Sequence, residues 1–397
     1  MQYSTIKIKK DRDANIFWQH PWIFSGAIER MPTDIPHGSL VGVESSDGKI
    51  LGLGTFSKSS TITVRMLDFS DAVIDETWWL NKITAAHEQR TLLGYGTKTQ
   101  TTGYRVLFGE ADGVPGLVVD RFENILVLQI STAGIEEMKP LILAALKKVF
   151  KPKAIVERSD IHVRRDENLP EFKDVLDGKI SKPIEFLENG LTFTADVLNG
   201  QKTGFFTDQK NLRAAMEKFA DGRKVLDTFS YSGAAGVYAL RGGAKSVSFL
   251  DSSADALALC EAHVALNFPK KKKSIETIDE DAFNFVGSME EGRFDMILLD
   301  PPALIKSSKD AESGKKAYHF LNRAALRALP DKGILVTSSC SHFLPEDDFV
   351  FILRRAAVQA GVKLHILESV RQSPDHPDSL TFPEARYLKS FIALVRK

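Results

Sequence analysis

The chain is poor in cysteine, balanced in charge and without long apolar runs. Its 397 residues include only two cysteines, which favours a reducing compartment over a disulfide scaffold. No N-terminal apolar segment and no bilayer-length stretch is apparent, so we expect a cytoplasmic protein that does not bind a membrane. The formal net charge is zero. This argues against a general polyanion-coating protein but is compatible with a nucleic-acid enzyme whose charge is segregated by region.

The short basic and aromatic stretches are predicted to be structural rather than RNA-binding. The basic stretches at Lys7–Lys10, Arg164–Arg165 and Lys270–Lys273 are predicted to be solvated surface rather than a phosphate track. Four aromatic residues near the N-terminus are predicted to be barrel core rather than base-stacking contacts; they are Phe17, Trp18, Trp22 and Phe24.

The length and a 43% apolar content allow two or three domains. Short β-rich runs before residue 70 predict a small barrel or sandwich. A helix near 75–94 and mixed strands around a second helix near 134–149 predict an α+β segment. We therefore expect a small β domain at 1–72, a central α+β domain at 73–185 and a third domain at 186–397.

The third domain alternates strands with helices. Its predicted strands are 224–227, 246–251, 274–277, 294–300 and 333–339, and its predicted helices are 209–220, 234–240, 254–268, 317–329 and 346–360. Such alternation predicts an α/β fold with a doubly wound, mostly parallel sheet, which binds ligands beyond the carboxyl ends of its strands. Asp227, Asp251, Asp300 and Cys340 all fall at or near those ends.

The first of these strands leads into a turn of small residues. Phe229, Ser230 and Gly233 lie in that turn, where the backbone can approach a ligand closely and the following helix offers N–H donors. The turn lacks the G-x-G-x-x-G pattern, which disfavours a nicotinamide cofactor.

Two further strand ends carry carboxylates. Asp251, which Ser252 follows, is placed to accept hydrogen bonds from ribose hydroxyls. Asp281, which Ala282 follows, is placed to contact an adenine amino group. Taken singly, each aspartate is as well explained as a helix N-cap. Together with Asp227, at successive strand ends, they indicate adenosine recognition, and the arrangement resembles a class I S-adenosylmethionine methyltransferase.

The sequence Asp300-Pro301-Pro302 is typical of methyltransferases that act on exocyclic amines, but a stacking aromatic residue usually follows it. Here Ala303 and Leu304 follow. A pyrimidine carbon-5 fits better, because a cysteine thiolate that adds to carbon-6 makes carbon-5 nucleophilic. Asp300 would then contact the N3 edge of the ring.

Cys340 is the predicted nucleophile, and packing as a small buried hydrophobe is its alternative role. Cys260 lies on an apolar helix and is predicted to be packing only. His342 is either a base that removes the carbon-5 proton or an exposed loop residue. No metal site is expected.

Several motifs together resemble one family, the ribosomal RNA large-subunit 5-methylcytosine methyltransferases with an N-terminal PUA domain. Besides the turn after Asp227 and the motifs at Asp300 and Cys340, they are His20–Gly26, Gly113–Leu117, Lys202–Gln209, Arg371-Gln372, Asp375–Pro377 and Tyr387–Lys389. The resemblance implies RNA binding by residues 1–72, S-adenosylmethionine as methyl donor, Cys340 as nucleophile and Gln209 near the methionine part of the donor. Leu304 departs from an aromatic residue found in many relatives.

The partner is expected to be ribosomal RNA, and a homodimer is one expectation for the assembly. Two alternatives remain: a 5-methyluridine RNA methyltransferase, which uses the same thiol adduct, and a non-catalytic RNA-binding or ribosome assembly factor. The target nucleotide, and whether the substrate is naked RNA or a ribosomal particle, do not follow from the sequence.

Overall fold

The computed structural model describes residues 3–397, except the side chains of Lys272 and Lys273. That part of the predicted Lys270–Lys273 surface therefore lies outside the described residues. The chain divides into two compact units, of which unit 1 comprises Met1–Gly190, Thr194–Thr207 and Pro374–Ala385. Unit 2 comprises Leu191–Phe193, Asp208–Ser373 and Arg386–Lys397.

Unit 1 begins with a five-stranded sheet in the order β1-β3-β4-β5-β2. Its strands are β1 (Ser4–Lys7), β2 (Trp22–Phe24), β3 (Leu40–Glu44), β4 (Ile50–Phe56) and β5 (Ile62–Asp68). Buried aliphatic side chains on alternating positions, such as Val41 and Val43, fill its core. The predicted small β fold is confirmed.

The prediction that the N-terminal aromatic residues form this core is wrong for three of them. Phe17 and Trp18 are 77% and 71% exposed, and Phe24 is 45% exposed. Helix α1 (Ala14–Phe17) has four residues and buries only Ile16, because aliphatic side chains already fill the interior. Trp22 is half-buried, and its indole N–H donates to Glu110 at 2.9 Å.

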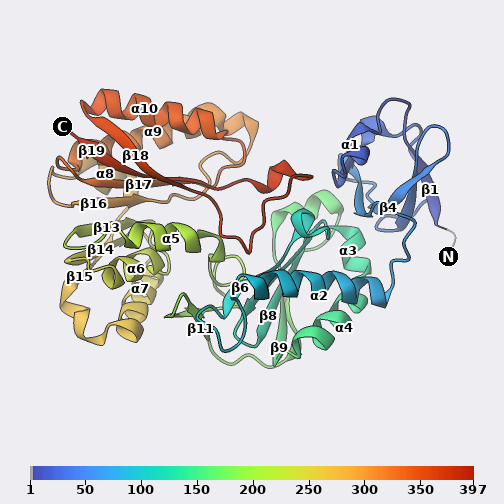
Figure 1. Ribbon diagram of the computed structural model, residues 1–397, viewed down its shortest axis with the longest axis horizontal. Helices are drawn as coiled ribbons and strands as arrows, with labels where there is room; N and C mark the ends of the chain where they lie inside the picture. The colour runs from blue at the N-terminus through green and yellow to red at the C-terminus, as the bar shows by residue number, and fades with distance from the viewer. Residues whose placement is uncertain (1–2) are drawn as a thin grey trace. The chain divides into compact units, whose positions relative to one another are not determined.

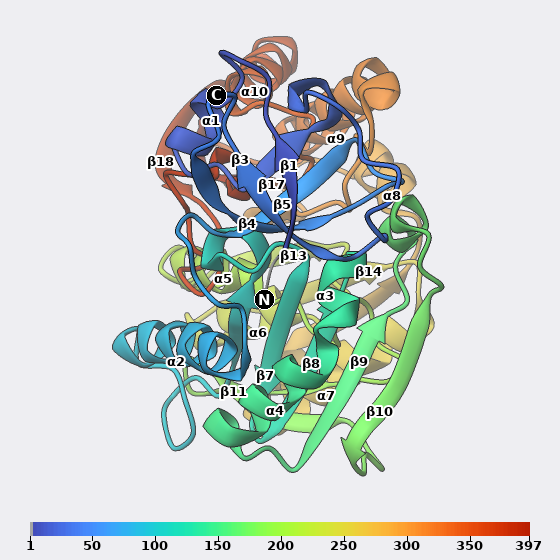
Figure 2. The ribbon, with the colours of Figure 1, turned by 90° about the vertical axis from the view of Figure 1, so that its right-hand side faces the viewer.

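A second sheet of unit 1 has the order β10-β9-β8-β7-β6. Figure 2 shows strands β7 to β10 side by side. Helices α2 and α4 pack against each other and contribute to the same apolar core as the sheet. The elements are α2 (Glu76–Leu92), β6 (Gly103–Phe108), β7 (Leu117–Phe122), β8 (Ile125–Ile130), α3 (Ala133–Glu137), α4 (Lys139–Phe150), β9 (Ala154–Ser159) and β10 (Phe172–Gly178), followed by β11 (Ile184–Glu188) and β12 (Leu191–Ala195).

Arg164 corrects the prediction of a solvated basic pair. Its side chain is buried, and its guanidinium donates to the carbonyl of Ile130 at 2.8 Å and to Glu136 at 2.9 Å. A buried guanidinium is stable only when its donors are satisfied in this way. The neighbouring Arg165 has a side chain that is 71% exposed, as predicted.

Unit 2 contains a seven-stranded sheet in the order β15-β14-β13-β16-β17-β19-β18. β19 is antiparallel to β17 and to β18, and the other pairs in the sheet are parallel, so the predicted doubly wound, mostly parallel sheet is confirmed. The strands are β13 (Lys224–Thr228), β14 (Ser246–Asp251), β15 (Ile275–Asp279), β16 (Met296–Leu299), β17 (Ile334–Ser339), β18 (Lys363–Val370) and β19 (Lys389–Arg396).

Helices lie on both faces of this sheet (Figure 1). Helices α5 to α7 pack in sequence against one another, as do α8 to α10. They are α5 (Lys210–Glu217), α6 (Ala234–Arg241), α7 (Ala254–Asn267), α8 (Ala282–Ser288), α9 (Ala311–Ala328) and α10 (Glu346–Ala360). The sequence pattern did not predict α8, β18 or β19, and it began α9 several residues late.

No helix of residues 3–397 has the length and apolar character needed to cross a membrane. Within the same residues, no three or more His, Cys, Asp and Glu side chains group as metal ligands would.

Candidate active site

The turn after β13 is tightly folded. Phe229, Tyr231 and Gly233 all have positive φ, at 54°, 48° and 62°. Ser230 closes the turn, because its hydroxyl donates to the carbonyl of Asp227 at 2.7 Å and its carbonyl accepts the Gly233 N–H at 2.7 Å. A Cβ at Gly233 would lie 2.8 Å from the sulfur of Cys260. Glycine is therefore favoured at position 233 by space as well as by backbone conformation.

Asp227 is buried beneath this turn. Its carboxylate accepts the Gly236 N–H of α6 at 2.9 Å. Burial raises the pKa of Asp227 to about 8, against the lowering effect of that N–H, and the carboxylates of Asp300 and Asp251 add to the rise. Asp227 is thus close enough to Asp251 and Asp300 for their charges to affect its pKa, as expected for residues at the ends of neighbouring strands.

Asp251 ends β14 and holds the turn from the side. One of its oxygens accepts the Tyr231 N–H at 2.9 Å, and the other accepts the Ser253 N–H at 3.0 Å. The residue is only partly buried, and the neighbouring Ser252 is exposed. A carboxylate has about four acceptor positions, so Asp251 retains capacity for ribose hydroxyls.

Asp281 lies after β15, next to β14 in the sheet. Its side chain accepts the Asn284 N–H at 3.0 Å and caps α8, which is the alternative role considered for it. Asp281 is exposed and Ala282 is buried.

Gln209 joins Asp300 directly. Its side-chain amide donates to both carboxylate oxygens of Asp300, at 2.9 and 3.0 Å. Its carbonyl oxygen is buried and accepts no hydrogen bond from the described residues. A buried acceptor in that position fits a cationic donor group such as the ammonium of a methionine moiety.

Cys340 follows β17, which pairs in parallel with β16, the strand that leads to Asp300. The thiol-bearing residue is half-buried. Just beyond it, the Ser341 hydroxyl accepts the Ile305 N–H at 3.1 Å. This bond ties the turn that carries Cys340 to the loop that carries Asp300.

Leu304, in the loop after Asp300, stands where many relatives have an aromatic residue. Its side chain is partly buried and packs into the apolar core. Phe343, in the turn after Cys340, is 47% exposed, and the ring of the exposed His342 contacts it edge-on at 5.7 Å between centroids. Cys260 is buried on α7, as predicted, and burial raises the pKa of its thiol.

Lys389 was not among the residues predicted for the site. It lies on β19 opposite Ser339 in register. Its ammonium donates to the carbonyls of Ser341 and Leu344, both at 2.8 Å. Its position in the Tyr387–Lys389 motif was the signal available in the sequence, but the antiparallel strand that carries it had not been recognised.

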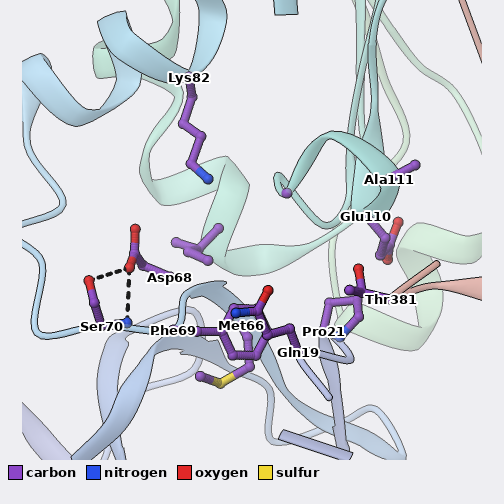
Figure 3. Close-up of a pocket in the computed structure, with 12 residues that line it drawn as sticks. Gln19, Pro21, Met66, Asp68, Phe69, Ser70, Lys82, Glu110, Ala111 and Thr381 are labelled. Atoms are coloured by element: carbon purple, nitrogen blue, oxygen red, sulfur yellow. Dashed lines mark hydrogen bonds between the residues drawn. The ribbon is translucent and has the colours of Figure 1, made fainter. Parts of the chain in front are cut away.

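A separate polar pocket in unit 1 has a volume of about 380 Å³. Figure 3 shows Lys82, Asp68 and Glu110 around it. Both carboxylates already accept indole N–H groups, Asp68 from Trp78 and Glu110 from Trp22, each at 2.9 Å. These bonds indicate a structural role, and the residues that line the pocket include no cysteine, so the site in unit 2 is the better candidate for the chemistry.

Comparisons with known proteins agree with this assignment. Residues 6–69 match a PUA-like domain, and residues 170–392 match an S-adenosylmethionine-dependent methyltransferase family. A ribosomal RNA large subunit methyltransferase I from Yersinia pestis is 35% identical over 392 residues, which cover 98% of each chain.

Two solved structures share the fold. A proposed SAM-dependent methyltransferase from Streptococcus mutans has a TM-score of 0.83 at 20% identity, covering 98% of this chain and 100% of that one. A proposed methyltransferase in complex with SAH has a TM-score of 0.84 at 20% identity, covering 99% and 100%.

Proposed function

This chain belongs to the family of the ribosomal RNA large subunit methyltransferase I proteins, and on that premise we propose that it methylates carbon-5 of a cytosine in large-subunit ribosomal RNA. It is an S-adenosylmethionine-dependent methyltransferase. The relatives' substrate and their full-length match support the RNA part of the proposal. The observation that carries the chemistry is the thiol of Cys340, half-buried at a strand end beside the strand that leads to Asp300.

The methyl donor, when bound, supplies an electrophilic methyl group on a sulfonium. In our proposal the carbonyl of Gln209 accepts its ammonium, and Asp251 accepts its ribose hydroxyls. Phe229, Ser230 and Gly233 bring the backbone close to it, while Asp227 holds that turn in shape from below. Ser252, Asp281 and Ala282 stand at the adenine end, where Asp281 also caps α8.

Cys340 provides the nucleophile. Its thiolate adds to carbon-6 of cytosine, and the electron pair of the C5–C6 double bond makes carbon-5 nucleophilic. Asp300 contacts the N3 edge, and its carboxyl, when protonated, donates a hydrogen bond to N3 that supports the attack. After carbon-5 takes the methyl group, a base accepts the carbon-5 proton, and the electron pair of that C–H bond restores the double bond as the thiolate leaves.

Phe343 is our proposed stacking surface for the base. Leu304 cannot stack, whereas Phe343 is an exposed ring three residues beyond the nucleophile. Its neighbours Ser341 and Leu344 are fully buried, so the turn presents the ring from a fixed backbone. Stacking on aromatic side chains is the usual way in which proteins hold an unpaired RNA base.

Bisulfite sequencing of ribosomal RNA from a strain that lacks the gene tests the proposal. We expect one large-subunit cytosine to become newly converted, wild-type protein to restore its protection, and Cys340→Ala to fail. If no cytosine changes but a 5-methyluridine is lost, the base assignment is wrong. If Cys340→Ala restores full protection, covalent catalysis is wrong.

We further propose that the protein acts in the cytoplasm. A homodimer stays a prediction. Light scattering coupled to size-exclusion chromatography checks it, with a mass near 88 kDa expected for a dimer against 44.0 kDa for one chain.

A further inference from the structure

The turn that follows Cys340 is anchored at both ends. Ser341 and Leu344 are each fully buried. The Ser341 hydroxyl accepts the Ile305 N–H and lies 3.0 Å from the Tyr318 hydroxyl, which in turn accepts a hydrogen bond from Ser339 at 3.0 Å. Hydroxyl networks of this kind fix a backbone when every member is satisfied.

The other anchor is the ammonium of Lys389. Lys389 as a whole is only 7% exposed, and its ammonium donates to the carbonyls of Ser341 and Leu344, the two ends of the turn. A lysine carries three N–H donors, and these two bonds use two of them. Burial of an ammonium is costly unless it gains such partners.

The charges around Lys389 come from several elements. Burial lowers the pKa of Lys389 to about 8, while Cys340 and Glu346 act to raise it. Glu346, at the start of α10, is bound by the partly exposed Arg371 at 2.9 Å.

Three further titratable groups lie on neighbouring segments of the chain. Tyr318 of α9 has its phenol pKa raised by burial and is neutral. Asp300, after β16, is held by Gln209, and His342 is exposed to solvent. Of the groups named here, Lys389 is the buried cation, and its ammonium donates to the carbonyl of Ser341, the residue that follows Cys340.

We propose that Lys389 is a positioning residue for Cys340, which fixes the turn from Ser341 to Leu344 and stabilises the thiolate form of the nucleophile. In the deprotonation step the S–H bond breaks, the proton passes to solvent water, and the sulfur retains the electron pair beside the ammonium. A cation close to a thiol favours its thiolate. The role of Cys340 as nucleophile rests on the proposed function, whereas the state of its thiol is a property of the protein without RNA or methyl donor and is tested in that form.

The test is the pH dependence of Cys340 alkylation by iodoacetamide in the full chain, followed by peptide mass spectrometry. The thiolate sulfur attacks the carbon that carries iodine, a C–S bond forms, and iodide leaves. For Lys389→Met we expect the pH of half-maximal rate to rise by about one unit, so that alkylation at pH 7 slows about tenfold.

Two variants act as matched controls. Lys389→Arg keeps the charge and should stay within about twofold of wild type. Lys363→Met removes an exposed lysine of β18 and should do the same. The buried Cys260 in the same chain should remain unmodified, which reports that each variant is folded.

Three results would overturn the proposal: a Lys389→Met profile that coincides with wild type, a Lys389→Arg profile that shifts as far as the Met variant, or a wild-type half-maximal pH at or above that of N-acetylcysteine. The last comparison needs no variant and decides the question even if Lys389→Met does not fold. Because the assay contains no RNA, its failure would leave cytosine methylation untouched.

Discussion

At the scale of single residues, Cys340 and Asp300 occupy turns that follow neighbouring strands, and one hydrogen bond between Ser341 and Ile305 joins these turns. The sequence could place both residues at strand ends, because apolar runs precede them. It could not reveal Lys389, whose position depends on a strand that returns antiparallel from the C-terminus. The sequence also could not decide whether Asp281 caps a helix or binds the methyl donor, because both roles use the same carboxylate.

Gln209→Met should weaken binding of the methyl donor. The change removes the amide that donates to Asp300 and the carbonyl proposed to accept the ammonium. Hydrogen bonds to charged groups contribute about 1.5–3 kcal/mol, which corresponds to roughly a 10- to 100-fold loss in affinity by isothermal titration calorimetry. The exposed Gln359→Met on α10 is the control and should bind as wild type does; equal affinity for both variants would contradict the role given to Gln209.

Phe343→Ala should raise KM for RNA more than it lowers kcat, because it removes a stacking surface but leaves the nucleophile in place. Base stacking on an aromatic side chain is worth about 1–3 kcal/mol, so we expect roughly a 5- to 100-fold rise. Phe343→Tyr should retain most activity. Phe351, an exposed phenylalanine on α10, provides the control, and an equal effect of Phe351→Ala would refute a specific role for Phe343.

At the scale of elements, the turn between β13 and α6 is held by carboxylates. Asp227 bonds the backbone of α6, and Asp251 bonds the backbone of the turn. The pattern of strand, small-residue turn and helix predicts such a turn, but it does not tell that Asp227 is fully buried. Asp227 is buried because other strands of the sheet lie on both sides of its own strand. A local sequence pattern carries no information about those strands.

Asp227→Asn should stabilise the protein in a pH-dependent way. The folded-state pKa is raised from 3.8 to about 8, so the folded form binds the proton more strongly than the unfolded form does. Stability from this group is fully present below about pH 4 and is lost as pH rises to about 8. Asn removes this loss. The difference in Tm, variant minus wild type, should therefore grow by on the order of 5 °C as the pH is raised from 5 to 8.5.

The exposed Asp255→Asn is the control for that experiment. If the difference in Tm between Asp227→Asn and wild type does not grow with pH, Asp227 is not the buried acid described here.

Ser253 caps α7, because its hydroxyl accepts the Ala256 N–H at 3.3 Å. Ser253→Ala should lower the free energy of unfolding by about 1 kcal/mol. Ser252→Ala, one residue earlier and outside the helix, should change it by less than about 0.5 kcal/mol. Urea denaturation followed by circular dichroism measures both, and equal losses would argue against the cap.

At the scale of the whole molecule, strand–helix alternation predicted the sheet of unit 2 up to β17. It missed β18, although α10 precedes that strand, and it could not predict β19, because no α-helix lies between β18 and β19. Between these strands, residues Pro374–Ala385 belong to unit 1. There the carbonyl of Asp375 accepts a hydrogen bond from Arg90 at 2.8 Å, and its carboxylate accepts the Arg105 N–H at 2.9 Å. Local patterns cannot predict contacts between residues this distant in the chain.

Arg90→Met should strongly destabilise unit 1. Arg90 is fully buried and makes a two-bond pair with Asp112, at 2.7 Å for each bond. Its loss leaves a buried carboxylate unpaired, which costs about 3–5 kcal/mol. All four tryptophans, at positions 18, 22, 78 and 79, lie in unit 1, so tryptophan fluorescence during denaturation follows this unit. The exposed Arg165→Met should cost less than about 1 kcal/mol, and similar losses for both variants would contradict the network.

The central claim is that Cys340 attacks the pyrimidine ring. The most direct measurement is to incubate the protein and methyl donor with large-subunit ribosomal RNA that contains 5-fluorocytosine, and to look for a complex that survives denaturing electrophoresis. Fluorine cannot leave as a proton, so the adduct should accumulate with wild-type protein and be absent with Cys340→Ala. No trapped complex from active enzyme, or an equal yield from Cys340→Ala, would contradict the account.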